Sequence, residues 1–143
     1  MAKANYLSNA FLKLVFNATA VTNIADNAAS APLTNLYVSL HTADPGAGGS
    51  QTTSEISYTG YARVAVARTT GGFTVTGQTL TPAATIAWAI STGGTGGTAT
   101  FFAVGTASTG TGNLLYSGAI SPTIVVTSGV TPQLTVATTV VES

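Results

Sequence analysis

The chain has 143 residues, of which 45% are apolar, and this is enough for one domain with its own hydrophobic core. Only four residues are basic, so no basic patch could neutralise a run of phosphates, and nucleic-acid binding is not expected. The absence of cysteine excludes disulfides and thiolate metal sites. No apolar run approaches the roughly 20 residues that cross a bilayer, so we expect no membrane association.

The first predicted element is a helix in the segment NYLSNAFLKLVFNATA, which begins at Asn5. Asn5 is a candidate N-cap. Apolar residues recur in this segment at i, i+4, i+7 and i+8, so they share one face of a helix: Leu7, Phe11, Leu14 and Val15. The polar segment 22–35, which contains Pro32, is predicted to be a loop.

From Leu36 onward, short β-prone runs alternate with clusters of Gly, Pro, Ser and Thr. The runs predict strands at 36–42, 61–70, 73–80, 84–91, 98–107, 113–120, 123–128 and 133–141. Within them Gly77 is interpreted as a bulge, and Ile86, Trp88 and Ile90 are expected to point inward. About eight evenly spaced strands without intervening helices favour a mainly-β fold: an antiparallel β-sandwich, jelly-roll or Greek-key-like, with one N-terminal helix.

We expect two regions in one compact domain. Residues 1–34 would form the helix and a connecting arm, and residues 35–143 would form the β-sandwich. Whether the helix packs on its own domain or on a neighbour stays open at this point.

The stretch LYVSLHTADPG holds the only histidine, His41, and one of the four acidic residues, Asp44. A zinc site would need a third ligand, for which Glu55 is the nearby candidate, and a serine nucleophile would need a G-x-S-x-G elbow, which the chain lacks. The simpler interpretation is a strand that ends in a turn, with Asp accepting backbone N–H groups, Pro fixing φ and Gly permitting positive φ. We therefore predict no enzyme activity, no catalytic residue, no metal site and no cofactor.

Two other patterns suggest binding functions that we consider weaker. The GGTGG segment at 93–97 is followed by a strand and has no lysine nearby, so it is interpreted as a hairpin connection and not as a phosphate loop. Thr74 and Thr76 share one face of a strand, as in some sugar-binding surfaces, but no threonine ladder repeats along the chain. A small carbohydrate-binding module is therefore the least favoured alternative.

Only 6% of the residues are charged and the formal net charge is zero, so little repulsion keeps copies of the chain apart. We therefore expect a subunit of an assembly. The predicted interface has two parts, an N-terminal arm and the long loop 43–60, and we expect Arg63 to pair with Glu55 or Asp44 and so fix that loop to the sheet. The residues assigned to this interface are Tyr6, Leu7, Phe11, Phe16, Asp44, Glu55 and Arg63.

Three motifs appear in a recognisable order: LYVSLHTADPG at 36–46, GYARVAV at 60–66 and GNLLYSGAIS at 112–121. In this order the chain resembles, from about residue 5 to 141, a family of small tailed-bacteriophage virion structural proteins that are tail-fibre-like or decoration-type. It departs from that pattern at TGGTGG, where relatives often carry a tryptophan or charged residues.

The resemblance implies a non-enzymatic virion protein that is assembled in the host cytoplasm. Its partners would be copies of itself and other virion proteins, such as the major capsid protein or tail proteins. Compactness leads us to favour a capsid decoration, or cement, protein that oligomerises and stabilises the shell. The alternative is a tail-associated subunit of the baseplate or tail fibre.

Overall fold

The computed structural model describes residues 4–21, 24–28 and 31–142. These residues form one helix and nine strands in antiparallel sheets. The prediction of a mainly-β, antiparallel fold with a single N-terminal helix is confirmed. In this part of the chain no helix has the length and apolarity needed to cross a membrane.

The chain divides into two compact units, each built from separate stretches of sequence. Unit 1 contains Met1–Asn35, Val66–Thr85 and Thr135–Ser143, and unit 2 contains Leu36–Ala65 and Ile86–Leu134. This grouping differs from the expected division after residue 34, because the helix shares its unit with a central hairpin and the C-terminal segment.

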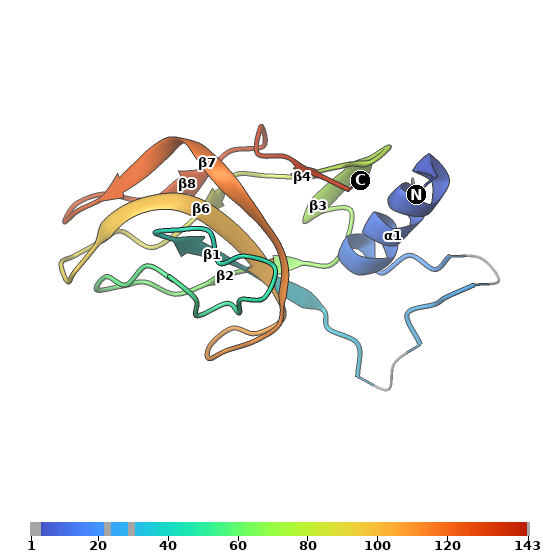
Figure 1. Cartoon of the computed structure of the whole chain (residues 1–143), viewed down its shortest axis with the longest axis horizontal. Coiled ribbons are helices and arrows are strands. Elements are labelled where there is room, and N and C mark those ends of the chain that lie inside the picture. Colours follow the sequence, from blue (N-terminus) through green and yellow to red (C-terminus); the bar gives the residue numbers. More distant parts are fainter. Residues whose placement is uncertain (1–3, 22–23, 29–30, 143) are drawn as a thin grey trace. The chain divides into compact units, whose positions relative to one another are not determined.

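Unit 1 combines helix α1 (Asn5–Asn17) with a three-stranded sheet, seen beside it in Figure 1. The order in the sheet is β3 (Phe73–Thr76), β4 (Thr79–Pro82) and β9 (Val140–Val141). The single strand predicted at 73–80 is wrong, because β3 and β4 pair as a hairpin in which Thr76 faces Thr79. Gly77 lies in the two-residue turn with φ of 60°, a conformation that glycine adopts without strain.

Helix α1 buries a different face from the one predicted. Its buried residues are Ser8, Leu12 and Phe16, which also follow an i, i+4, i+8 spacing. The helix carries apolar residues on more than one side, so periodicity did not identify the face that packs on the hairpin. The rings of Phe16 and Phe73 meet edge to face with centroids 5.0 Å apart. Asn5 is the first helical residue and not the N-cap, which is Ala4.

The side chain of Arg68 caps the C-terminal end of α1. Its Nε donates to the carbonyl of Val15 at 2.7 Å, and Nη2 donates to that of Leu14 at 2.9 Å. The last four carbonyls of a helix have no partner within it, and a cation there also complements the helix dipole. The same guanidinium donates to the Leu33 carbonyl and to Oδ1 of Asn27, so it fixes the connecting segment to the helix end.

Unit 2 holds most of a four-stranded sheet and a short two-stranded one. The larger sheet has the order β2 (Val64–Ala67), β1 (Asn35–His41), β6 (Gly97–Gly105) and β7 (Leu114–Val126), and the smaller one pairs β5 (Ile86–Ala87) with β8 (Gln133–Leu134). The strands predicted at 113–120 and 123–128 are one strand, and the one predicted at 133–141 is divided between β8 and β9.

The apolar core of unit 2 includes Leu36, Val38 and Leu40 from one face of β1. Trp88 is also buried, as predicted, whereas Ile90 is 50% exposed. Strand β5 ends at Ala87, so the alternation expected for 84–91 does not continue to Ile90.

Candidate functional site

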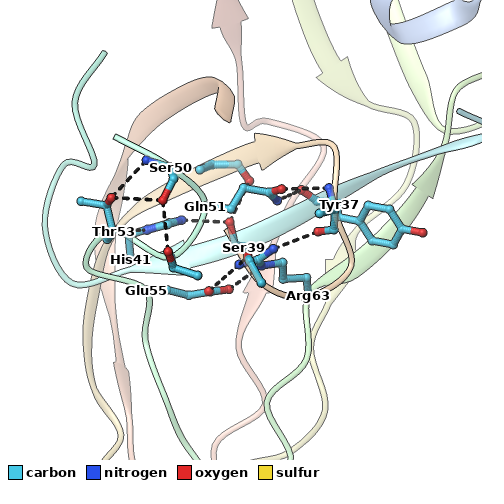
Figure 2. Close-up of polar contacts among 12 residues, drawn as sticks. Tyr37, Ser39, His41, Ser50, Gln51, Thr53, Glu55 and Arg63 are labelled. Atoms are coloured by element: carbon cyan, nitrogen blue, oxygen red, sulfur yellow. Dashed lines mark hydrogen bonds and ion pairs between the residues drawn. The ribbon is translucent and has the colours of Figure 1, made fainter. Parts of the chain in front are cut away.

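The most distinctive feature of unit 2 is a cluster of buried polar side chains beside strand β1 (Figure 2). Alternation along the strand places Ser39 and His41 on the face opposite Leu36, Val38 and Leu40. Both polar residues are fully buried, so both faces of β1 are covered at this end. Buried polar groups must find hydrogen-bond partners, and in this cluster they come from two loops, 43–60 and 106–113.

An ion pair between Arg63 and Glu55 forms the centre of the cluster. Nε of Arg63 donates to Oε1 of Glu55 at 2.8 Å, and Nη2 donates to Oε2 at 2.8 Å. The two side chains are 3% and 15% exposed. This bidentate geometry is the strongest form of an Arg–carboxylate contact. The sequence-based prediction that Arg63 pairs with Glu55 or Asp44 is confirmed for Glu55.

Arg63 also binds the second loop. Its Nη1 donates to the carbonyl of Ala107 at 2.9 Å, and Nη2 donates to that of Gly110 at 2.7 Å. One guanidinium therefore connects the 43–60 loop, through Glu55, to the connection between β6 and β7. The hydrogen bonds to Glu55 raise the pKa of Arg63, so it stays a cation.

Tyr61 completes the surroundings of the carboxylate. Its hydroxyl donates to Oε1 of Glu55 at 2.8 Å and accepts the backbone N–H of Leu40 at 3.2 Å. Burial, followed by the negative charge of Glu55, raises the pKa of Tyr61 far above its usual range. The phenol therefore stays protonated and serves as a hydrogen-bond donor.

His41 holds the middle of the loop 43–60 at Thr53. Its Nδ1 lies 2.8 Å from the carbonyl oxygen of Thr53, and its Nε2 lies 2.8 Å from Oγ of Ser39. A carbonyl can only accept, so Nδ1 carries the hydrogen and Nε2 of the neutral ring accepts from the serine. Burial lowers the pKa of His41, which keeps the ring neutral.

A serine hydroxyl on a histidine nitrogen is also the geometry of an activated nucleophile. In this cluster Ser39 and His41 are both 0% exposed, and Ser39 faces Ala103 of β6 within the sheet. A catalytic group must touch its substrate, and these two are covered by the protein's own strands and loop. The pair therefore acts in this structure as an internal hydrogen bond.

Gln51 is a fully buried amide that joins the two loops. Its Oε1 accepts the N–H of Ala107 at 2.9 Å, and its backbone N–H donates to the carbonyl of Thr111 at 3.0 Å. The amide occupies space left by Gly105 and Gly112, where a Cβ atom would overlap its side chain. The absence of side chains at these two glycines therefore allows Gln51 to insert between β6 and the loop.

Asp44 lies outside this cluster, on the surface. Its Oδ1 accepts the N–H of Gly46 at 2.9 Å and the hydroxyl of Ser117 at 3.2 Å. Gly46 has a φ of 69°, so the turn predicted for ADPG is confirmed. Asp44, Glu55 and His41 do not converge on a common point, and the described residues contain no group of three His, Asp or Glu side chains that could hold a metal ion.

The residues assigned to the N-terminal part of the interface lie in unit 1. Tyr6, Leu7 and Phe11 are 67%, 47% and 42% exposed. Phe16 is fully buried against the hairpin of its own unit, so it presents no surface to a partner in this structure. For the other three residues the interface stays a prediction.

Sequence reasoning missed Ser39, Gln51 and Tyr61. Ser39 could have been found, because a serine two positions before a histidine in a strand lies on the same face. Gln51 stands in a loop rich in Gly, Ser and Thr, where no periodicity marks a buried residue.

The hydrogen bonds of the cluster connect the loops 43–60 and 106–113 to each other and to β1. Residues 2–142 match the family model described as podophage GP4 fiber I protein gp80. No curated protein matches the chain. The predicted resemblance to phage virion structural proteins is confirmed by the family match. The chain therefore belongs to the podophage GP4 fiber I protein gp80 family and is a structural component of a bacteriophage virion.

Proposed function

We propose that this protein is a non-enzymatic subunit of a podophage tail fibre. The observation that carries the proposal is the family match, which extends over residues 2–142 and whose description names a fibre protein. Compactness and low charge, the features that favoured a capsid decoration protein, suit a tail fibre equally well. The family description therefore favours the tail over the shell.

The buried cluster fits a protein that works outside the cell. A fibre is exposed to varying salt and to proteases, and this chain has no cysteine with which to form disulfides. The Arg63–Glu55 pair is nearly shielded from solvent, so salt screens it much less than a surface pair. In this proposal the cluster keeps the loops 43–60 and 106–113 in one conformation.

The exposed residues Tyr6, Leu7 and Phe11 of α1 provide the surface for a neighbouring virion protein in this proposal. Phe11→Asp should leave the melting temperature close to that of the wild type and reduce incorporation into particles. Unfolding of the variant would instead assign Phe11 to the core of unit 1.

Electron microscopy of particles labelled with an antibody against this chain tests the proposal directly. Label on the tail of intact particles is the expected result. Label distributed over the capsid would assign the chain to shell decoration, and particles without label would exclude it from the mature virion.

A further inference from the structure

Strand β7 forms one edge of the four-stranded sheet of unit 2. It pairs with β6 on one side, and among the described residues no strand pairs with its other side. With 13 residues it is about twice as long as a typical strand of five or six. Proteins usually keep edge strands short or protect them with charged side chains, because an open edge can pair with another chain.

No charged residue stands on β7 itself. The segment 86–134, which includes β6 and β7, contains no charged residue. The charges of unit 2 are Asp44, Glu55 and Arg63, and the last two are paired with each other inside it. Asp44 is therefore the single charge that unit 2 leaves exposed. Its carboxylate accepts the hydroxyl of Ser117 on β7 at 3.2 Å, so it lies beside this strand. Two copies of this unit would meet with only one exposed carboxylate on each to repel the other.

The part of β7 that can accept another strand is well defined. Tyr116–Ala119 pairs in regular register with Phe101–Val104 of β6, and the register shifts at both ends of this stretch. Pro122 lies beyond the register shift that follows Ala119, and it has no backbone N–H to donate to a paired strand. In a regular antiparallel stretch alternate residues direct their N–H and C=O groups away from the paired neighbour. Ser117, Gly118 and Ala119 are small, so another backbone can approach them closely.

We propose that this stretch of β7 pairs with a strand of a second copy of the chain, so that the sheet of unit 2 continues from one copy into the next. A second copy fits better than a different protein because the surface offers almost no charge for a complementary partner to recognise. Backbone pairing needs no such complementarity, and every copy carries the same open edge. The proposal holds for either location of the protein in the virion.

Ala119→Lys tests the pairing at an exposed position within this stretch of β7. This change would place an ammonium group beside the edge, where pairing with another strand would desolvate it. Ala87→Lys is the matched control, since Ala87 is an exposed alanine on β5 of the same unit. Native mass spectrometry and light scattering over a concentration series would give the mass of the wild type and each variant, and circular dichroism would confirm that each is folded.

The wild type is expected to form a discrete oligomer, and Ala119→Lys is expected to raise its dissociation constant by about tenfold or more. The control should keep the wild-type value. A wild type that stays monomeric at every concentration would overturn the proposal and leave the edge to a different virion protein. A folded Ala119→Lys variant with the wild-type dissociation constant would also overturn it, as would an equal loss of association in Ala87→Lys.

Discussion

Replacing Arg63 by methionine tests whether the buried ion pair holds the two loops of unit 2. Methionine fills much of the space of the arginine stem but removes the hydrogen bonds that the guanidinium donates to Glu55, Ala107 and Gly110. Glu55 would be left without its cation. Removing one partner of a buried pair costs about 3–5 kcal/mol. The Glu55 side chain is 15% exposed, so water can offset part of the loss, and we expect about 3 kcal/mol.

For a chain of this length, a loss of 1 kcal/mol lowers the melting temperature by about 3–4 °C. Arg63→Met should therefore melt about 10 °C below the wild type, as followed by circular dichroism at neutral pH. The loops 43–60 and 106–113 should also be cut faster by a protease of broad specificity, because their anchors are gone. Mass spectrometry of the first products would identify the cut sites.

Two control variants separate the causes. Arg63→Lys keeps the positive charge but cannot form the bidentate contact, so its melting temperature should be intermediate. Adding Glu55→Gln to Arg63→Met removes the unpaired charge and should recover part of the loss. If Arg63→Met melts with the wild type and neither loop is cut faster, the ion pair does not hold the loops and our interpretation of the cluster is wrong.

Three further predictions concern other buried residues. Burial lowers the pKa of His41 below its ordinary value of 6.5, so just below pH 6.5 the unfolded chain binds more protons than the folded chain. The free energy of unfolding should therefore decrease as the pH is lowered through this window. His41→Gln should lack this pH dependence. Phe16→Ala removes a fully buried ring and should cost about 3–5 kcal/mol in denaturant unfolding. Gly105→Ala should cost about 1–3 kcal/mol, because its methyl group would overlap Gln51.

The results that would contradict these predictions are equally specific. An identical pH profile in the wild type and His41→Gln would show that His41 is not the titrating group. A Phe16→Ala variant as stable as the wild type would contradict the core assignment of that ring. The effect of Gly105→Ala should shrink when Gln51→Ala is added, because the two sites share one space, and simple additivity would contradict the proposed overlap.

The sequence predicted the strand at 36–42, its turn and the Arg63–Glu55 pair for a physical reason. Charged residues are so scarce that each arginine has few possible partners, and the Asp-Pro-Gly order restricts the backbone of the turn. The packing face of the helix could not be predicted in this way, because Leu12 and Phe16 compete with Leu7 and Phe11 as an apolar pair. Tertiary packing on the β3–β4 hairpin decides between them, and the sequence of the helix alone does not contain that information.

The positions of the two arginines connect the stability of each unit with the assembly that we infer. Arg68 is committed to the carbonyl groups at the end of α1, and Arg63 to Glu55 and the loop beside β6. Each arginine therefore orders loops inside its own unit, and the buried Arg63 contributes little charge to the surface. The same arrangement that fixes the loops leaves unit 2 almost uncharged outside, which is the condition for edge pairing between copies. Arg63→Met should consequently disturb the loops without blocking association through β7, whereas Ala119→Lys should do the reverse.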